Sequence, residues 1–199
     1  MTDKASMQGK LFLIVGPSGS GKGTVIKKMK AKYIGFIYPI SYTTRDPREG
    51  EVDGDVYHFI SRDKFQEMID AGEFLEYATV HETDFYGTSK KDIMDGLSQG
   101  NVVMREVDIQ GFNSIKEIIP EENLVSIFMK VVGEEDLKKR ILMRGEMSDA
   151  ELARRMESTL KEIAQADKCK YQVENKWGEI TACVANVEKI ILDEIKDIY

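Results

Sequence analysis

The chain has 199 residues, enough for one compact domain with a substantial apolar core. Its 28 Lys and Arg residues are outnumbered by 35 Asp and Glu residues, so the net charge of −7 argues against a general nucleic-acid-binding surface. Because no apolar run is long enough to cross a bilayer and MTDKASMQGK lacks a signal-peptide pattern, we expect a cytoplasmic protein that does not bind membranes.

The first predicted elements are a strand, a glycine-rich loop and a helix. The strand Leu11–Val15 reads LFLIV, and the stretch from Gly21 to Lys32 contains good helix formers. Between them, GPSGSGKGT has the spacing of a P-loop, in which curled backbone N–H groups and a helix N-terminus bind phosphate. An ordinary glycine-rich turn is the alternative, but the spacing, the lysine and both flanks favour the P-loop. The expected ATP-binding residues of the loop are Gly16, Pro17, Ser18, Gly19, Ser20, Gly21, Lys22, Gly23 and Thr24.

The residue after the P-loop lysine bears on metal binding. P-loops usually place a Ser or Thr there as a magnesium ligand, whereas this chain has Gly23, with Thr24 one position later. We therefore expect Mg²⁺ to be held chiefly by nucleotide oxygens and waters, with Thr24 as one candidate ligand.

Residues 41–87 differ in texture from their surroundings and are predicted to form an inserted substrate-binding subdomain. The segment SYTTRDPREGEVDGDVYHF carries two arginines, Arg45 and Arg48, on either side of Pro47. Guanidinium groups match phosphate oxygens bidentately, and proline favours an extended chain before it. The alternative is a solvated basic loop whose arginines pair with Glu49 and Glu51 at the surface.

Strands then alternate with helices, which predicts an α/β fold with a parallel sheet covered on both faces. The expected elements are a helix over Ser89–Ser98 and strands over Asn101–Val107 and Asn123–Met129. Near the end of the first of these strands, Glu106 and Asp108 are two residues apart and therefore face the same side. Asp108 can also cap the next helix, which is compatible with a role in the site.

The last third is strongly helical. Arg140 and Arg144 lie four residues apart on one predicted helical face, Gly145 interrupts the pattern, and Ser148 with a glutamate three residues later forms a capping box. Two helices joined by a hinge would make a lid, although each arginine taken singly is an ordinary surface residue. Val187–Ile198 has helical apolar spacing and is expected to pack on the core. The two cysteines, Cys169 and Cys183, lack metal or redox spacing and are read as structural thiols.

These motifs together resemble the guanylate kinase family over about Leu11 to Asn175. Besides the GKGT reading of the P-loop, five segments carry the resemblance: SYTTRDPREGEVDGDVYHF, EFLEYA, FYGTS, REVDIQG and EDLKKRILMRGEMSDAELARRM. The resemblance implies a three-layer P-loop NTPase core at residues 9–40, 89–132 and 168–199, a GMP-binding subdomain at 41–88 and a helical lid at 133–167. It implies Mg-dependent transfer of the ATP γ-phosphate to GMP, and to dGMP, giving ADP and GDP.

The resemblance also implies roles for individual residues. Arg45, Arg48 and Tyr57 would grip the phosphate of GMP, while Glu76 would read the donors of guanine, unless it is only a solvent-facing strand residue. The full expected GMP-binding set is Ser41, Arg45, Arg48, Glu51, Tyr57, Glu76, Tyr86, Thr88, Glu106 and Asp108. The expected catalytic set is Lys22, Arg45, Arg140, Arg144 and Arg155. Asn175 would contact adenine, and Asp108 would reach Mg²⁺ through water.

Arg105 departs from the family pattern, which usually has an apolar residue at this position. Because an unpaired buried guanidinium is costly, we expect its side chain to reach solvent or a carboxylate. Two other functions stay open. Guanylate-kinase-like modules in scaffold proteins bind peptides without catalysis, but the P-loop and lid look intact here. A related P-loop kinase would act on another monophosphate, which the guanine-facing residues argue against. The sequence predicts no oligomeric state.

Overall fold

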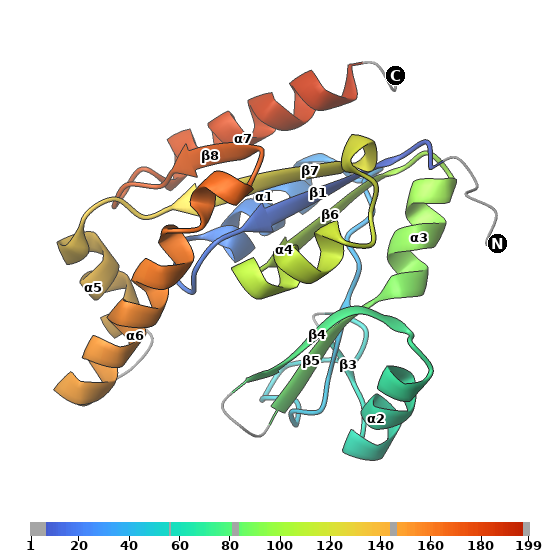
Figure 1. Cartoon of the computed structure of the whole chain (residues 1–199), viewed down its shortest axis with the longest axis horizontal. Helices are drawn as coiled ribbons and strands as arrows, with labels where there is room; N and C mark the ends of the chain where they lie inside the picture. The colour runs from blue at the N-terminus through green and yellow to red at the C-terminus, as the bar shows by residue number, and fades with distance from the viewer. Residues whose placement is uncertain (1–6, 56, 81–83, 144–146, 197–199) are drawn as a thin grey trace.

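The central sheet has four parallel strands in the order β6-β1-β7-β8 in the computed structural model, which describes residues 7–55, 57–80, 84–143 and 147–196. The strands are β1 (Lys10–Val15), β6 (Val102–Val107), β7 (Leu124–Lys130) and β8 (Tyr171–Glu174). In β1, which lies between β6 and β7, Leu11–Val15 is fully buried. The predicted parallel sheet is therefore confirmed (Figure 1).

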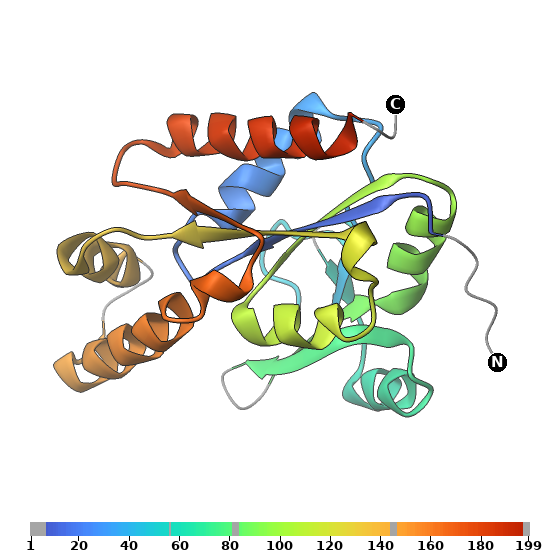
Figure 2. The ribbon, with the colours of Figure 1, turned by 45° about the horizontal axis from the view of Figure 1, so that its top comes forward.

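Helices cover both faces of this sheet, as Figure 2 shows with the sheet nearly edge-on. One face is covered by α1 (Lys22–Lys32) and α7 (Ile180–Ile195), and the other by α3 (Lys90–Ser98) and α4 (Ile109–Lys116). Alternate residues of β1 supply the two cores: Leu11 and Leu13 pack toward α3 and α4, whereas Phe12 and Ile14 pack toward α1 and α7. A strand buried on both faces reads as a continuous apolar run, which explains LFLIV.

The C-terminal helix α7 begins earlier than the predicted Val187. Its buried stripe starts one turn before that residue, at Cys183, and continues through Ile191 and Ile195. Cys183 and Cys169 are both free and buried, and burial raises the pKa of each thiol to about 11. The expected helix end at Ile198 lies outside the described residues.

Glu194 links α7 to β1 and β8, the first and last strands of the chain. Its carboxylate accepts hydrogen bonds from Lys10 Nζ at 3.1 Å and from the Tyr171 hydroxyl at 2.6 Å, and it pairs with Lys170 at 2.6 Å. Although burial opposes ionisation, these three donors together lower the pKa of Glu194 to about 2. The cluster lies at the opposite end of the strands from the P-loop.

Residues 41–89 build a second sheet in the order β3-β2-β5-β4. Its elements are β2 (Ser41–Thr43), β3 (Tyr57–Phe59), α2 (Arg62–Asp70), β4 (Phe74–Val80) and β5 (Asp84–Ser89). One face of this inserted sheet packs on α2 through Phe65, Met68 and Phe74. The other face carries the candidate acceptor residues described below.

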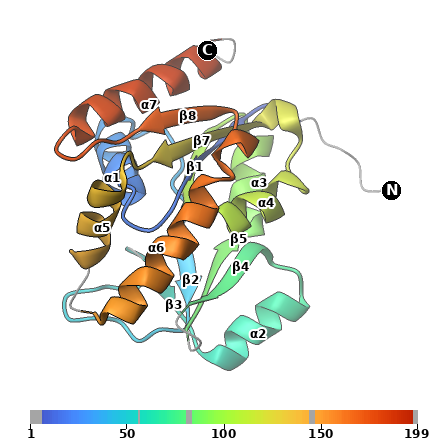
Figure 3. The same cartoon turned by 60° about the vertical axis from the view of Figure 1, so that its left-hand side comes forward.

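Two helices form the predicted lid segment: α5 (Glu134–Leu142) and α6 (Asp149–Ile163). They pack on each other through Leu137, Ile141 and Leu152, among other residues. The Ser148 half of the predicted capping box is confirmed, since its hydroxyl accepts from Glu151 N at 3.3 Å, while the Glu151 carboxylate pairs with Arg155. Figure 3 shows α5 and α6 projecting, like the inserted sheet, on the side of the core away from α7.

Two short 3-10 helices complete the elements, Glu121–Asn123 before β7 and Ala166–Lys168 before β8. The last α-helix of the predicted lid, which was expected to extend to residue 167, thus ends at Ile163, and a tight turn leads into the last strand. Across the described part of the chain, no helix combines the length and the apolar character that a membrane crossing needs.

Candidate active site

A cleft of about 1060 Å³ opens at the carboxyl ends of the core strands. Ligands of open α/β sheets bind at this edge. Its wall is formed by the P-loop after β1, the end of β6, the lid helices and the segment that follows β8. The position of the cleft therefore matches the place where the sequence predicted nucleotide binding.

The P-loop has the backbone that its glycines predict. Gly19 and Gly21 have φ of 84° and 98°, in the left-handed region that side chains rarely adopt. Helix α1 starts at Lys22, and Gly21 offers it no side-chain cap, so the first N–H groups stay available to an anion. A side chain at position 21 would not fit, because its β-carbon would lie 2.6 Å from Asn175 Nδ2.

Lys22 lies over the loop that it follows. Its Nζ donates to the carbonyl oxygens of Gly16 at 2.7 Å and Pro17 at 2.9 Å. Lys22, Gly23 and Thr24 all line the cleft, and the Glu106 carboxylate faces Gly23. The ammonium group is thus held at the mouth of the P-loop, where phosphate oxygens of a nucleotide would replace the carbonyls as partners.

Asn175 supports the P-loop from beneath. The residue is 1% exposed, its Nδ2 donates to Ser20 O at 2.8 Å, and its own N–H donates to Lys130 O at 2.9 Å. Asn175, the residue expected to contact adenine, also lines the cleft next to the P-loop. The Nδ2 of its amide is thus engaged in fixing the loop, while its buried Oδ1 has no hydrogen-bond partner.

Arg140 joins the lid to the P-loop. Its guanidinium pairs with Asp136 at 2.7 Å and donates to Gly19 O at 3.2 Å and to Asn175 O at 2.9 Å. It also lies 5.6 Å from the centre of the Trp177 ring. Of the expected catalytic arginines, Arg140 is therefore at the cleft.

The other two lid arginines are placed differently. Arg155 lies on α6, is not part of the cleft lining, and pairs with Glu151 at 2.7 Å. Arg144 lies outside the described residues, as does the predicted hinge at Gly145. The structure thus brings Lys22 and Arg140 together and leaves Arg155 on the outer part of the lid.

The inserted sheet aligns four of the expected GMP-binding residues in a single row. Register pairs Tyr57 with Ser41, Ser41 with Thr88, and Thr88 with Glu76, so one row crosses all four strands. Paired residues share a face of a sheet. The sequence distance between Ser41 and Glu76 conceals this alignment, which the strand register creates.

Glu76 is half-buried in this row rather than solvent-facing, which excludes the alternative interpretation. Burial raises the pKa of its carboxyl, while the hydrogen bond from the Thr88 hydroxyl at 2.5 Å and the nearby Arg105 charge oppose that rise. A β-carbon at Gly111 would lie 3.4 Å from Glu76 Oε2 and 3.5 Å from Asp108 Oδ1. The row therefore meets the core at the N-terminus of α4.

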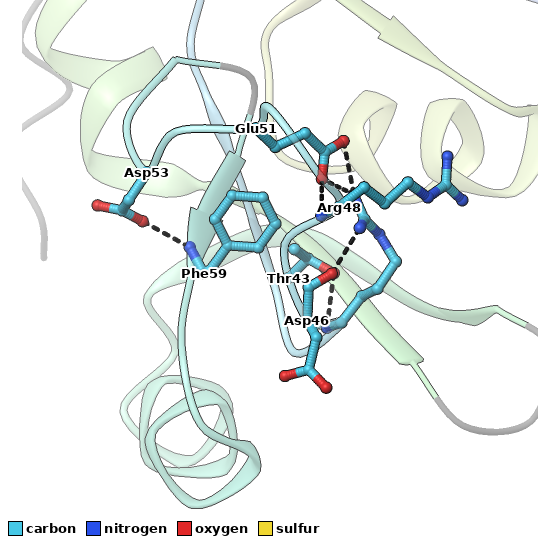
Figure 4. Close-up of polar contacts among 7 residues, drawn as sticks. Thr43, Asp46, Arg48, Glu51, Asp53 and Phe59 are labelled. Atoms are coloured by element: carbon cyan, nitrogen blue, oxygen red, sulfur yellow. Dashed lines mark hydrogen bonds and ion pairs between the residues drawn. The ribbon is translucent and has the colours of Figure 1, made fainter.

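The loop that carries Arg45 and Arg48, here called the arginine loop, follows β2 (Figure 4). Arg45 Nη2 donates to both oxygens of Glu51 at 2.9 and 3.0 Å, and its guanidinium lies 5.6 Å from the ring centre of Tyr57. Arg48 donates its backbone N–H to Glu51 at 2.7 Å, while its side chain extends away from that carboxylate (Figure 4). The ion-pair interpretation is right about one pair, Arg45 with Glu51, but this pair is largely shielded from solvent instead of lying at the surface. Phosphate binding by the two arginines stays a prediction.

Tyr86 lies beside the arginine loop. Its ring is 5.6 Å from that of Tyr57 in an edge-on arrangement. Burial lowers the pKa of Arg45, but hydrogen bonds to Glu51 and Tyr86 outweigh burial and the pKa is raised. The backbone N–H of Arg48 is the largest influence that lowers the pKa of Glu51. The Arg45 guanidinium is therefore charged, and the Glu51 carboxylate holds it in position.

Glu106 and Asp108 both line the cleft, so they face the same side, as their spacing predicted. The Asp108 side chain also accepts from Gly111 N at 2.8 Å and so caps α4. The two roles proposed for it are compatible in space, because one carboxylate oxygen suffices for the cap.

Arg105 is half-buried, and none of the ion pairs among the described residues joins its guanidinium to a carboxylate. Instead, Nη1 donates to Pro39 O at 3.0 Å, and Nη2 donates to the Ser41 hydroxyl. Of the two expected surroundings, a carboxylate partner is thus not found, while the residue stays partly exposed. Burial lowers the pKa of the guanidinium, and the charges of Glu76 and Glu106 oppose that effect. The Pro39 carbonyl and the Ser41 hydroxyl are partners of its two Nη groups, whereas its Nε is buried without a partner, and sequence spacing reveals none of these contacts.

Several cleft residues were missed, and all of them except Met143 lie outside the quoted motifs. Glu162 on α6 lines the cleft and has a buried, unpartnered Oε2, and burial together with the Asp108 charge raises its pKa. Trp177 is 49% exposed in the cleft wall. The only tryptophan of the chain, two residues beyond Asn175, was a signal that could have found this wall. The remaining missed residues are Met143, Lys176, Gly178 and Ile180.

Comparisons with known proteins agree with this geometry. A family model described as guanylate kinase matches residues 8–194. A guanylate kinase of Clostridioides difficile (strain 630) is 41% identical over 187 residues, covering 94% of this chain and 89% of the relative. One of Campylobacter jejuni (strain RM1221) is 40% identical over 170 residues, covering 85% and 82%. In fold, the chain is similar to the crystal structure of guanylate kinase from Anaplasma phagocytophilum, with a TM-score of 0.73 at 24% identity over 97% of this chain and 90% of that one.

Proposed function

This chain belongs to the guanylate kinase family, so its reaction is transfer of the terminal phosphate of ATP to GMP, and we propose that the cleft binds the two nucleotides end to end. The observation that carries this proposal is the meeting of two different surfaces at Glu106 and Asp108. A phosphate cradle lies on one side, and a row of purine-reading groups lies on the other. The chain is therefore a nucleoside monophosphate kinase that forms ADP and GDP.

The donor half binds ATP through backbone amides and cations. The uncapped N-terminus of α1 and the curled loop take the β-phosphate, while Lys22 moves from its carbonyl partners to the β- and γ-phosphates. Arg140 contacts both the P-loop and the wall at Trp177, so it links the phosphate end of the site to the base end. The exposed indole gives adenine an aromatic surface on which to stack.

The acceptor half binds GMP through side chains. Arg45, Arg48, Tyr57 and Tyr86 gather at the phosphate end, where the planar fork of arginine suits a phosphate. Glu76 accepts from N1 and N2 of guanine, and hydroxyls of the same row complete the edge. Adenine would leave these buried groups unpaired, and such sites reject a mismatched analogue by about 10⁴ to 10⁵. Because these groups read the base, dGMP is a second acceptor.

The chemistry requires positioning and charge stabilisation. The GMP phosphate is already an anionic nucleophile, so no general base is needed. Lys22 and Arg140 stand where charge spreads over the transferred group. Arg155 and Arg144 join them when the lid closes, which for Arg155 means leaving Glu151. Closure also excludes water, which strengthens each electrostatic contact and prevents hydrolysis of ATP.

The residues of the cleft fit an Mg²⁺ ion that is bound mainly by phosphate oxygens and waters and only to a small extent by the protein. Among the described residues, no group of three or more His, Cys, Asp or Glu side chains could hold a metal. Thr24 and Asp108 do offer hard oxygen atoms in the cleft wall, and Mg²⁺ needs only one or two such groups beside phosphates and waters. When bound, Mg²⁺ neutralises phosphate charge. Thr24 and Asp108 would orient it, Asp108 through water.

A coupled assay with ATP and each of GMP, dGMP, AMP, CMP and UMP tests the proposal. Turnover with the two guanine nucleotides and none with the others is expected. Turnover with AMP instead would contradict the acceptor assignment, and calorimetry that finds no ATP binding would favour a peptide-binding module. A cytoplasmic location stays a prediction, which fractionation tests.

A further inference from the structure

Arg105 reaches from the core sheet to the inserted sheet. It lies on β6, yet its guanidinium donates to Pro39 O at 3.0 Å and to the Ser41 hydroxyl, at the point where the chain enters β2. Glu106 on β6, Glu76 on β4 and Tyr57 on β3 face it as the charged and titratable groups. Arg105 thus lies next to the row formed by Tyr57, Ser41, Thr88 and Glu76.

The hydrogens of this row can be counted. The Thr88 hydroxyl donates to Glu76 Oε1, so its single hydrogen is used. A guanidinium has donors and no acceptor, so the Ser41 hydrogen has to point away from Arg105. Within the described residues, that hydrogen has no protein acceptor. Of the two hydroxyls between Tyr57 and Glu76 in the row, Ser41 alone keeps a hydrogen to donate.

We propose that Arg105 is a positioning residue that fixes Ser41 as the hydrogen-bond donor to the 6-oxo oxygen of guanine. The inference rests on the proposed function, because it places GMP against the inserted sheet. Guanine presents an acceptor at position 6 and donors at N1 and N2, which match Ser41 as donor and Glu76 as acceptor. Adenine presents an amino group at position 6, so two donors would face each other.

The surroundings of Arg105 support a role beyond packing. Its neighbours on β6, Val102, Val103 and Met104, are buried apolar residues, and its own Nε is buried without a partner. Such a group calls for a specific explanation. Its charge also opposes the rise in the pKa of Glu76 that burial causes, which keeps that carboxylate available as an acceptor.

The test compares ligands that differ at position 6. Arg105→Met keeps an apolar stem and removes the donors. We expect the KM for GMP to rise about tenfold, as for one lost hydrogen bond, and IMP, which also carries the 6-oxo group, to weaken by the same factor. The monophosphate of 2-aminopurine riboside has no 6-oxo group, so its inhibition constant should stay within about twofold. An equal loss for all three ligands, or no loss for GMP, would overturn the proposal.

A double-mutant cycle with Ser41→Ala tests whether Arg105 acts through Ser41. If it does, the double variant binds GMP about as weakly as either single variant, because the same hydrogen bond is removed once. Additive losses, about a hundredfold in the double variant, would show that Arg105 acts by another route.

Two measurements separate this inference from folding defects and from the proposed function. The KM for ATP and the thermal midpoint report an intact core in Arg105→Met. Should that variant not fold, Arg105→Lys keeps the charge and loses the fork, and the ratio of GMP to 2-aminopurine affinity decides the question: a reduced ratio supports the proposal and an unchanged one contradicts it. A wild-type protein inactive on GMP would refute the proposed function itself, whereas an active one with an indifferent Arg105 refutes only the inference.

Discussion

In the proposed function, the donor half and the acceptor half of the site hold their ligands by different means. The donor half uses consecutive backbone groups and a lysine, all within residues 16–24 after the central strand β1. The acceptor half uses side chains from four strands, aligned by register across the inserted sheet. A phosphate is recognised by charge and N–H groups alone, whereas a purine must be told from other purines by the order of its donors and acceptors. The first task suits a local loop, and the second requires groups that a sheet brings together.

The sharpest test of the donor half removes its cation. Lys22→Met should lower kcat about 10³-fold, because a charge that acts on the transferring phosphate is lost from a preorganised site. The KM for GMP should stay within about threefold. Steady-state kinetics checks both values, with Lys27→Met on the exposed side of the same helix as the matched control. A comparable rise in the KM for GMP would mean that the halves are not separable.

The corresponding test of the acceptor half is Glu76→Gln. An amide offers guanine N1 and N2 a donor as well as an acceptor, so the KM for GMP should rise about 10²-fold while the KM for ATP stays unchanged. Equal changes in the two constants would reject the guanine role of Glu76. Thr88→Val, which removes the donor to this carboxylate, should shift the same constant in the same direction by less.

The pH dependence sharpens this comparison further. Because burial raises the pKa of Glu76, its carboxylate protonates at a higher pH than an ordinary glutamate as the pH falls. The kcat/KM for GMP should therefore decline on the acid side above the usual glutamate range. The GMP phosphate also titrates near pH 6. The difference between the wild-type and Glu76→Gln profiles isolates the side chain, and identical acid limbs would contradict the assignment.

Gly21→Ala should harm the donor half alone. Its β-carbon would meet Asn175 Nδ2 at 2.6 Å, and the backbone has a φ of 98°. The expected cost is about 2 kcal/mol in the free energy of unfolding and about tenfold in the KM for ATP, with GMP binding within twofold. Chemical denaturation and calorimetry measure these effects. Gly35→Ala, where nothing lies within 4 Å, is the neutral control.

The smallest effect is expected far from both halves. Glu194→Gln removes a carboxylate whose pKa is lowered to about 2, so it should reduce stability at neutral pH by about 1–2 kcal/mol without changing either KM. A carboxyl with a lowered pKa stabilises the fold above its unfolded pKa of about 4.5, and that stabilisation is lost as the pH falls toward 2. Thermal melts of both proteins should therefore converge in acid. A persistent difference there would indicate lost packing instead.

Local sequence was sufficient for the core. LFLIV, the glycine spacing and the helix formers after Lys22 predicted a strand, a phosphate loop and a helix, because each property depends on residues close together in the chain. Alternating strands and helices predicted the parallel sheet for the same reason. The early start of α7 was missed because a cysteine is a weak signal of an apolar stripe, whereas in the structure Cys183 is buried in the same apolar cluster as residues of α1 and the sheet.

Only the tertiary structure decided which distant groups meet. The bond from Arg105 to Ser41 spans 64 residues, and the one from Arg140 to Asn175 spans 35. Strand register sets the row from Tyr57 to Glu76, and the chain after β8 places Trp177 beside the lid. A motif carries its chemistry in the order of its residues, so the sequence by itself determined the phosphate loop. Contacts between separate elements depend on packing and register, which no local spacing encodes.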